Sequence, residues 1–542
     1  MSKESMERIK EQVEERIRKE QESVEPEKDK TDKDDEGLDI KYVSDCYMSN
    51  EVGDSRVYNA LHRGQYVYNT RSKCWYTYIS PHWDVDDSMR STASVEAVAV
   101  EYLKIFESIQ EQLDEIQGDK DKAGLRKSLY AKKKALIARL DRLRSAKGRT
   151  NVLTCAMSNS EPLVVAPEQL DQHPWLLPVK NCVIDLRTGK SRPGNPDDYL
   201  TRAAPVEWKG LDEPAPHWEK YLSDTLNNNQ EVIDFLLRAL GYSITGLNTE
   251  RLFVVLFGEH GNNGKGTLME ILFHVLGKLS SPIQSELLLA QKYGKSADAP
   301  CPAIMALKGL RLGWASETAA NHSFASDKIK LYSGGDPLAG RGLNEKVTTF
   351  MPNHVLFLLT NNLPGAPAPD TSFWERIKVI DYPFSFIKRP PVTDKEGNTT
   401  PAVLEKYQRL ADPELLDKLK SEESGILASL VRGCLAWQQK GLSPPKKVID
   451  DSQKYRRKQD DIQDFIEQCC HVDKTDPDVK SPAGILYKRY KDWWEDVASN
   501  RPLSMKKFGD LMSMKFEKIK SSNVIYLGIM VDVTKSIEGK SA

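Results

Sequence analysis

Glycines and a lysine follow an apolar run in residues 253–268, which read FVVLFGEHGNNGKGTL. The apolar residues 253–257 predict a buried strand, and the spacing of apolar residues from Leu268 to Leu276 predicts a helix. Glycines let successive backbone N–H groups turn toward a phosphate, the helix N-terminus adds partial positive charge, and Lys265 adds a full one. Strand, glycine loop with lysine, and helix form the phosphate-binding P-loop arrangement. We therefore predict a nucleotide site from these loop residues: Gly258, Gly261, Asn262, Asn263, Gly264, Lys265, Gly266 and Thr267.

Two positions of this loop depart from the usual P-loop pattern. Glu259 stands where the first glycine is expected, and Gly258 is one step too early. Gly266 stands where a serine or threonine usually binds magnesium, and Thr267 follows it. Either the loop is rebuilt so that Thr267 reaches the metal, or the metal is held through water. A glycine-rich turn with an unrelated lysine is the alternative, which the agreement of strand, lysine and helix disfavours.

Three polar residues further along the chain stand next to apolar runs, and we predict them as catalytic. Glu317 ends the run LKGLRLGWASE, where a carboxylate could orient the attacking water, although the preceding Ser316 leaves one usual metal carboxylate absent. Asn361 ends HVLFLLTNN, where an amide could sense the γ-phosphate or the water. Arg376 precedes another apolar run and could act on the ATP of a neighbouring subunit. Taken singly, Asn361 also fits an ordinary turn and Arg376 an ordinary surface arginine.

The composition favours an intracellular, multidomain protein. The 542 residues are 39% hydrophobic and 29% charged, which allows about three or four domains with real cores. The net charge of −2 gives no global basic field, so any nucleic-acid binding must come from local patches. The eight cysteines show no CxxC pair, and the segment Cys469-Cys470-His471 lacks a second zinc half-site. Without an apolar run of about 18 residues or a signal-like N-terminus, we expect a cytoplasmic protein with no membrane partner.

Changes in composition and hydrophobic periodicity along the chain predict five segments. Residues 1–37 are a charged, disordered tail, because mixed charge without aromatic residues cannot form a core. Residues 38–150 combine a small aromatic, strand-rich region with a basic helical segment, and residues 151–244 form a separate domain with a hairpin turn at Arg187-Thr-Gly. Residues 245–445 form the ATPase domain, which ends at Pro444-Pro445. Residues 446–542 form a small C-terminal domain.

Two features of the N-terminal region leave alternatives open. Asp84 and Asp86 could share the metal ions of a nucleotidyl transferase on one strand face, or they could belong to a simple acidic turn. The helical stretch Arg126–Arg149 has Asp141 as its only acid. It could lie along a phosphate backbone or present a solvated face, and the sequence favours neither.

The C-terminal segment predicts helices followed by strands. Helical periodicity covers residues 462–471, 485–497 and 506–515, and the β-rich stretch NVIYLGIMV follows. This order indicates a winged helix, in which the helix with Lys506 and Lys507 would enter a groove or lie on phosphates. A protein-docking domain is the alternative.

The stretch Lys330–Gly365 resembles the superfamily 3 helicase core of phage and plasmid helicase–primases and of the poxvirus NTPase–primase. The segments Asn181–Gly189 and Leu486–Val531 are similar to the N-terminal companion domain and the C-terminal domain of that family, so the resemblance covers about residues 150–540. The matching motifs keep their order and spacing: Lys330, Ser333-Gly-Gly-Asp336, Arg341, Pro352, Thr360-Asn361-x-x-Pro364, and Trp374 with Arg376.

This resemblance implies a hexameric ring with ATP at the subunit interfaces. It implies Lys265 and Thr267 on phosphate and magnesium, Glu317 as the catalytic acid, Asn361 as the sensor and Arg376 as an arginine finger acting on the neighbour. It also implies that the segment from Asp336 to Phe350 forms a hairpin in the channel that touches single-stranded DNA. Lys346 lies near its tip, and Lys330 and Arg341 join it as predicted DNA contacts.

We therefore expect an α/β protein with a P-loop ATPase core of the superfamily 3, AAA+-like type, a mixed α+β N-terminal region and a C-terminal winged-helix domain. The expected function is an ATP- and Mg²⁺-dependent replicative DNA helicase of a phage, plasmid or related mobile element. Its partners would be single-stranded and forked DNA, further copies of itself and a separate primase. The alternatives are a helicase–primase that uses Asp84 and Asp86, a non-catalytic DNA-binding initiator, and a P-loop kinase or metabolic ATPase.

Overall fold

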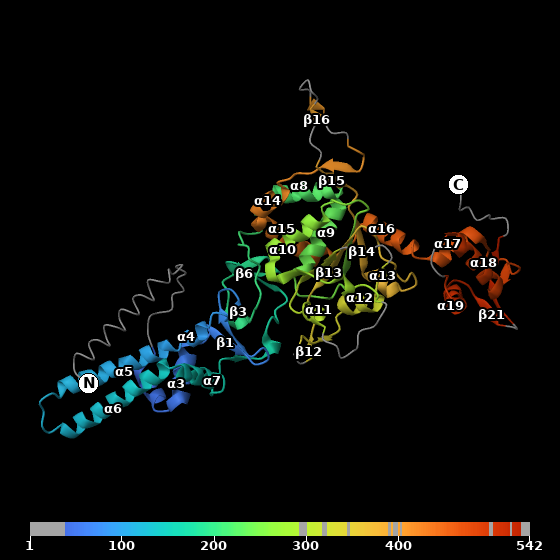
Figure 1. Ribbon diagram of the computed structural model, residues 1–542. Helices are drawn as coiled ribbons and strands as arrows, with labels where there is room; N and C mark the ends of the chain where they lie inside the picture. Colours follow the sequence, from blue (N-terminus) through green and yellow to red (C-terminus); the bar gives the residue numbers. More distant parts are fainter. Residues whose placement is uncertain are drawn as a thin grey trace. The chain divides into compact units, whose positions relative to one another are not determined.

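A computed structural model describes residues 38–291, 301–316, 322–343, 347–388, 392–393, 399–400, 404–497, 502–520 and 523–532 (Figure 1). The predicted tail at 1–37, Glu317 and Lys346 lie outside the described residues. Contacts divide the chain into two units. The first contains the chain up to Arg63 and residues Met89–Leu163, and the second contains Gly64–Ser88 and everything from Val164.

The first unit is built from helices. Apolar side chains recur every three or four residues and are buried, such as Val98 and Tyr102 on α5 and Leu136 and Leu140 on α6. The helix predicted from residue 94 to 145 is therefore present, as two packed helices with a break between them. The described helices of this unit are α2 (Ile40–Tyr47), α3 (Asn50–His62), α4 (Arg90–Ala93), α5 (Glu96–Glu115), α6 (Ala123–Arg144) and α7 (Ala146–Ala156).

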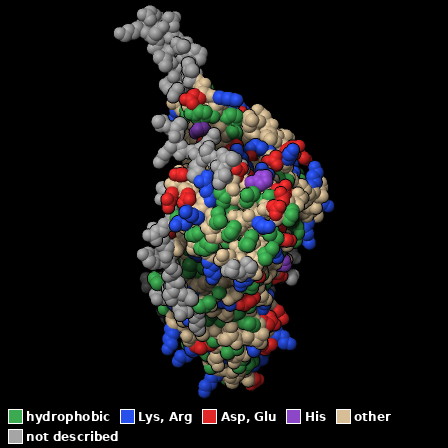
Figure 2. Space-filling model, turned by 90° about the vertical axis from the view of Figure 1, so that its right-hand side faces the viewer, with side chains coloured by type: hydrophobic (Ala, Val, Ile, Leu, Met, Phe, Trp, Pro, Cys, Tyr) green, Lys and Arg blue, Asp and Glu red, His purple; other side chains and the backbone are tan. Residues whose placement is uncertain are grey.

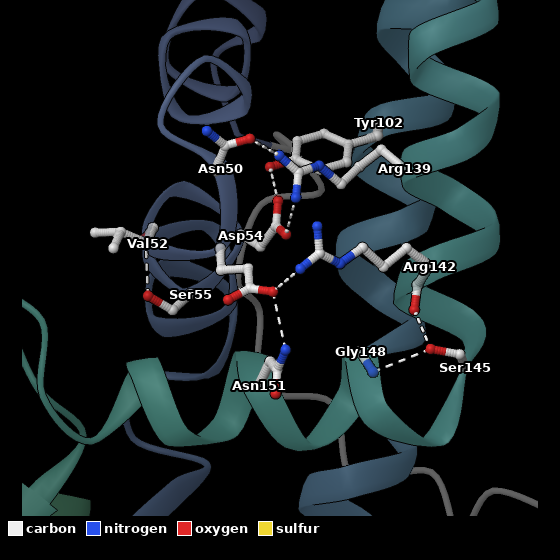
Figure 3. A network of polar contacts seen from close by, with 11 residues as sticks. Asn50, Val52, Asp54, Ser55, Tyr102, Arg139, Arg142, Ser145, Gly148 and Asn151 are labelled. Carbon is white, nitrogen blue, oxygen red and sulfur yellow. Dashed lines mark hydrogen bonds and ion pairs between the residues drawn. The ribbon is translucent and has the colours of Figure 1, made fainter.

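The last arginines of α6 turn into this unit (Figure 3). Arg139 Nη1 lies 3.2 Å from Asp54 Oδ2, with 8% and 3% of the two side chains exposed. The Tyr102 hydroxyl donates to Asp54 Oδ1 at 2.8 Å. Arg142 pairs with Glu51, and Arg144 Nη2 lies 2.8 Å from Glu96. This half of the basic helix therefore holds the unit together, which is neither of the two roles that the sequence left open.

Replacing Arg139 by methionine should lower the free energy of unfolding by about 3–5 kcal/mol, because Asp54 would stay buried without its counter-charge. Burial raises the pKa of Asp54, and the Tyr102 hydrogen bond and Arg139 counteract it. Urea unfolding of the full chain would measure the change. The exposed Lys132 on the same helix provides the control, since its replacement by methionine should change stability by no more than about 0.5 kcal/mol. Equal losses in both variants would contradict a special role for the buried pair.

The aromatic stretch of the N-terminal region belongs to the second unit, which corrects the predicted segment 38–150. Its alternating residues form strands, as expected, but β1 pairs in parallel with β4 beyond the helices, and Val67, Trp83 and Val165 share a small core. A second sheet is an antiparallel meander whose β6–β7 hairpin turns at the predicted Arg187-Thr-Gly. The strands are β1 (Tyr66–Asn69), β2 (Cys74–Tyr78), β3 (Trp83–Val85), β4 (Val164–Val165), β5 (Leu176–Val179), β6 (Cys182–Asp185) and β7 (Lys190–Arg192).

A five-stranded parallel sheet forms the centre of the second unit, in the order β14-β8-β13-β10-β9. Its inner strands β8 and β13 are almost continuously apolar because both faces are covered. Along β8, Val254 and Leu256 enter one core while Phe253 and Val255 enter the other. The strands are β8 (Phe253–Phe257), β9 (Ser280–Pro282), β10 (Leu312–Ser316), β13 (Val355–Thr360) and β14 (Ile377–Asp381).

Helices cover both faces of this sheet (Figure 1). On one face lie α8 (Pro216–Thr225), α9 (Gln230–Ser243), α10 (Lys265–Leu276), α14 (Leu415–Ser421) and α15 (Glu423–Lys440). On the other lie α11 (Pro302–Met305), α12 (Ser326–Tyr332) and α13 (Thr371–Arg376).

Three short strand pairs lie outside the sheet in the described residues between α12 and α14. The predicted hairpin between Asp336 and Phe350 is present as antiparallel β11 (Leu338–Gly340) and β12 (Thr348–Phe350). After β14, the chain forms the parallel pair β15 (Ser385–Ile387) and β18 (Gln408–Leu410), and between them the pair β16 (Val392–Thr393) and β17 (Thr399–Thr400).

The C-terminal segment contains the three predicted helices and the β-rich end, but two strands that were not predicted, β19 and β20, lie between the first and second helix. A core of aromatic and aliphatic residues, including Phe465, Tyr490 and Phe508, joins three helices to a three-stranded antiparallel sheet. The elements are α17 (Asp461–Cys469), β19 (Cys470–Val472), β20 (Lys480–Pro482), α18 (Ala483–Val497), α19 (Met505–Lys515), β21 (Lys518–Lys520), β22 (Val524–Leu527) and β23 (Ile529–Val531).

Helix α16 (Lys446–Arg457) belongs with the central sheet and not with this C-terminal core. It packs on β14, its Tyr455 is buried in the core around β8, and the Tyr455 hydroxyl donates to the Pro364 carbonyl. Pro445 precedes the first turn of α16, where a proline is compatible with a helix start. The predicted boundary at residue 445 is therefore misplaced, because the proline pair begins a helix instead of ending a domain.

The charged side chains on the face shown in Figure 2 are mixed in sign, with Lys and Arg interspersed among Asp and Glu. This agrees with the formal net charge of −2. In the parts of the chain that the structure describes, no helix is both long enough and apolar enough to cross a bilayer.

Candidate active site

The carboxyl ends of the neighbouring parallel strands β8 and β13 bring the glycine loop and Asn361 together. Strand β13 lies between β8 and β10, and Thr360 is in register with Phe257 while Ser316 is in register with Leu359. The glycine loop follows β8, Asn361 follows β13, and residue 317 follows β10. This edge of an open α/β sheet is where ligands bind in such folds.

Two glycines of the loop are required by its geometry. Gly264 has φ +91° and closes the loop onto α8, so that a Cβ there would lie 2.8 Å from Thr225 Cγ2. A Cβ on Gly258 would lie 2.1 Å from the Asn263 amide nitrogen. The departure at Glu259 therefore leaves the loop intact, because the first required glycine is Gly258 itself and Glu259 is exposed.

Neighbouring side chains and one backbone amide donate hydrogen bonds to the carbonyl groups of the loop. The Tyr221 hydroxyl donates to the Gly264 carbonyl at 2.9 Å, the Ser385 hydroxyl to Gly261 at 2.8 Å, and the Phe386 N–H to Asn262 at 2.7 Å. Inside the loop, the Asn263 amide donates to the His260 carbonyl at 2.6 Å. With these carbonyls fixed, the loop is held in one shape from α8 on one side and from β15 on the other.

The first turn of α10 follows the loop directly. Its first hydrogen bond back to the loop is from the Leu268 N–H to the Gly264 carbonyl, at 3.0 Å. The amides of Lys265, Gly266 and Thr267 precede it and have no intrahelical acceptor. Gly266 is exposed and a Cβ there would meet open space, and Thr267 is half-buried. The turn can therefore receive an anion at its N-terminus.

The Lys265 ammonium is held at the sheet edge. Its Nζ donates to Asn361 Oδ1 at 2.7 Å, and a longer contact of 3.4 Å reaches the Gly258 carbonyl. Lys265 is only 5% exposed. Burial lowers the pKa of Lys265 to about 8, and the nearby Asp381 partly opposes this shift. The structure thus brings the predicted lysine and the predicted sensor amide into contact.

The lowered pKa of Lys265 predicts a pH dependence of nucleotide binding. Phosphate oxygens favour the charged amine, so binding raises its pKa and takes up a proton above pH 8. The ATP association constant should be flat below about pH 7 and should fall about tenfold per pH unit from pH 8 to the pKa of the complex. Titrations with a fluorescent ATP analogue would measure it. Lys265→Arg keeps its charge and should remove the dependence; the same slope in this variant would assign it to another group.

The described residues at this edge of the sheet offer magnesium few protein ligands. Thr267 offers its hydroxyl from the first turn of α10, and Glu317 lies outside the described residues. Within the described ranges, no group of three or more His, Cys, Asp or Glu side chains could hold a metal ion. Mg²⁺ commonly keeps several waters and binds through substrate phosphates with one or two carboxylates, which this donor set allows.

Arg376 lies at the opposite edge of the sheet from Lys265. It is the last residue of α13 and precedes β14, whose Ile377 is in register with Phe253 at the start of β8. A five-residue strand spans about 16 Å, which an arginine side chain cannot cross to reach its own glycine loop. Arg376 Nη1 donates to the Ser372 carbonyl, and its buried Nε has no partner among the described residues.

Sequence reasoning missed Arg251, which lies near Arg376. Burial lowers the pKa of Arg376 first, and the charge of Arg251 lowers it further. Arg251 is exposed, has φ +50°, and stands two residues before β8. Two arginines close to each other favour an anion between them. The sequence signal was weak, since Arg251 is a single cation in a loop.

The structure describes two of the three DNA contacts that were predicted in the hairpin region. Lys330 Nζ forms an ion pair with Asp370 Oδ2 at 2.8 Å, and Asp370 caps α13, so this lysine positions the helix that carries Arg376. Arg341 follows β11 with a half-buried side chain, and its carbonyl accepts from the Cys301 N–H. Lys346 falls outside the described residues. The Lys330 ammonium is thus already engaged in an ion pair within the protein.

The remaining candidates lie in other parts of the second unit. Lys506 and Lys507 are exposed on the first turn of α19, where they can meet a phosphate. Asp84 lies 3.2 Å from Lys278 through both carboxylate oxygens, and no third metal-ligating side chain joins Asp84 and Asp86 in the described part of the chain. An ion pair is therefore the observed role of Asp84.

Comparisons with known proteins find relatives of this chain among viral proteins. Residues 55–227 match the family model described as "D5 N terminal like". The chain is 30% identical over 332 residues to the mimivirus protein named "Putative helicase L207/L206" from Acanthamoeba polyphaga mimivirus, covering 60% of this chain and 33% of that protein. It is 22% identical over 515 residues to "Putative helicase 121R" of Invertebrate iridescent virus 3, covering 87% of this chain and 53% of that protein.

A third relative is named as a primase and not as a helicase. The protein named "Putative primase C962R" of African swine fever virus is 24% identical over 373 residues, covering 65% of this chain and 36% of that protein. The chain thus spans about a third to a half of the length of these relatives.

Proposed function

Since the chain is a relative of the viral helicase–primases of the D5 type, we propose that it is an ATP-dependent DNA helicase that acts in replication. Its relatives are named as helicases or primases, which indicates an enzyme acting on nucleic acid. The observation that carries the ATP-driven part is the contact of Lys265 with Asn361 at the sheet edge, beside the first turn of α10.

We assign the binding of ATP to the loop and the first turn of α10. The β- and γ-phosphates take the place that Lys265 Nζ and the amides of Gly266 and Thr267 leave for an anion. Mg²⁺, when bound, neutralises charge on the phosphates, and Thr267 and water would hold it. On phosphate binding, Lys265 exchanges Asn361 for the phosphate, which releases the Asn361 amide to meet the γ-phosphate or the attacking water.

Hydrolysis in this proposal needs two further groups. Glu317, which directly follows β10, orients the attacking water and accepts its proton. Arg376 stabilises the charge that develops on the phosphates of a neighbouring subunit, because its place at the amino edge excludes its own site. Arg251 lies near it and adds positive charge to the same surface. An arginine that acts only on a neighbour requires an oligomer, and we propose a ring, of which a hexamer is the expected form.

The DNA contacts are proposed for two places. Around the β11–β12 hairpin, Arg341 and Lys346, which stand between the two strands in the sequence, would contact single-stranded DNA in the ring. In the C-terminal segment, we propose a winged helix whose α19, with Lys506 and Lys507, binds phosphates of a forked DNA. Primer synthesis is left to a separate primase, because Asp84 is paired with Lys278.

The test of the proposed function is the effect of single-stranded DNA on ATP hydrolysis. The helicase assignment expects clear stimulation by oligonucleotide and ATP-dependent strand separation of a forked duplex. A P-loop kinase or metabolic ATPase would hydrolyse ATP at a rate that oligonucleotide leaves unchanged. A non-catalytic initiator would bind DNA and ATP without turnover, so either result would reject the helicase.

A further inference from the structure

A basic row on the first half of α6 faces solvent and has no part in the proposed ATPase. It consists of Arg126, Lys127 and Lys134, and Tyr130 lies within it. The two lysines are exposed, Arg126 is half-buried, and Tyr130 is 59% exposed. Lys127, Tyr130 and Lys134 are three and four residues apart, which places them on one face of the helix.

The α6 basic row differs from the rest of the helix in its partners. Arg139, Arg142 and Arg144 pair with acids of the first unit, and Lys133 is buried over the Phe106 ring. Within the described part of the chain, none of the three cations of the row takes part in an ion pair. The sequence holds no acid between Asp121 and Asp141. The row is therefore a local positive field on a protein whose net charge is −2.

The neighbouring helix carries a matching acidic row. Glu107, Glu111, Asp114 and Glu115 are exposed on the second half of α5, which packs on α6. Exposed side chains of two packed helices project away from the contact between them, so the two rows reach solvent from different helices. Of the acidic row, Asp114 acts on Lys133, which is buried between the helices and is not part of the basic row.

We propose that the α6 basic row binds a single strand of DNA, with phosphates on the lysines and a base stacked on Tyr130. The choice of DNA rests on the proposed function. The row rises about 1.5 Å per residue over nine residues, which matches about three or four nucleotides at a stacked rise of about 3.4 Å. Cations without acids attract phosphates, and an exposed aromatic ring among them offers the stacking surface that single strands use.

A second copy of the chain, meeting the basic row with its α5 acidic row, is the competing occupant. The exposed ring of Tyr130 favours DNA, because pairing of two charged rows makes no use of an aromatic face while base stacking does.

The test measures binding of a fluorescent oligothymidylate to the full chain without nucleotide, over a range of salt concentrations. For Lys127→Gln with Lys134→Gln, the slope of log K against log salt should fall by about 0.7 for each cation removed. Tyr130→Ala should weaken binding about 5- to 100-fold, and Tyr130→Phe should bind as the parent does. The matched control, Glu107→Gln with Glu111→Gln on α5, should not weaken binding.

Two outcomes would overturn the proposal. Parent-like affinity and salt slope in the double-lysine variant would show that DNA does not use the row. If the variant instead changed the sedimentation coefficient while its affinity stayed the same, the row would meet a second copy of the chain. The assay contains no ATP and does not depend on ATP hydrolysis. A failure of the helicase assignment would appear in the hydrolysis and strand-separation assays, and the binding assay would still show whether the row binds DNA.

Discussion

Lys265→Ala should reduce ATP hydrolysis in the presence of oligonucleotide by at least about 10²–10³-fold, the usual effect of removing one preorganised donor from a developing phosphate charge. Lys265 is the one full positive charge of the glycine loop, and its Nζ lies at the sheet edge in contact with Asn361. A steady-state assay of phosphate release would measure the loss. Lys440→Ala, at an exposed lysine near the end of α15, is the control and should hydrolyse ATP as the parent does.

The stability of the same variant separates lost chemistry from lost folding. Burial holds the pKa of Lys265 near 8, so the empty site disfavours the charged amine. Removing that amine should leave the melting temperature of the nucleotide-free protein unchanged or raise it at pH 7. A variant that melts earlier and hydrolyses nothing would not identify a catalytic lysine. A well-folded variant with parental turnover would reject the nucleotide site, and the proposed helicase with it.

The central sheet and its site could be predicted because their signals are local. A buried strand, a glycine loop, a lysine and a helix follow one another within 24 residues, and the structure has β8, the loop and α10 in that order. The polar residues Asn361 and Glu317 follow apolar runs, and the carboxyl ends of parallel strands meet at one edge. The contact between Lys265 and Asn361 follows from this topology, although 96 positions separate them.

Other features depended on pairing between distant segments, which no local pattern encodes. Strand β1 pairs with β4, although helices α4 to α7 of the first unit stand between them in the sequence, so the aromatic strands could not be assigned to the second unit from their own residues. The basic character of α6 was visible, but the inward turn of Arg139 depends on Asp54, 85 positions earlier. Lys330 matched a family motif, and only the structure shows Asp370 as its partner.

Arg376→Ala should lower oligonucleotide-stimulated hydrolysis by about 10³-fold or more while nucleotide affinity of the protein stays near that of the parent, because an arginine finger acts on the transition state in a neighbour. Its position supports this expectation, since Arg376 precedes β14 at the amino edge and Lys265 follows β8 at the carboxyl edge. Arg376→Lys keeps the charge but loses the planar fork, and it should recover little of the rate.

Mixing two inactive variants tests the shared site directly. In a ring assembled from equal amounts of Arg376→Ala and Lys265→Ala, about a quarter of the interfaces would join an intact loop to an intact arginine, because head-to-tail contacts pair one face of each subunit with the other face of the next. Hydrolysis should therefore reappear on mixing, to about a quarter of the parental rate if the interfaces act independently. If Arg376 served its own subunit, every site in the mixture would lack one group and the mixture would stay inactive. Recovery must also require exchange of subunits, so variants mixed after cross-linking should show none.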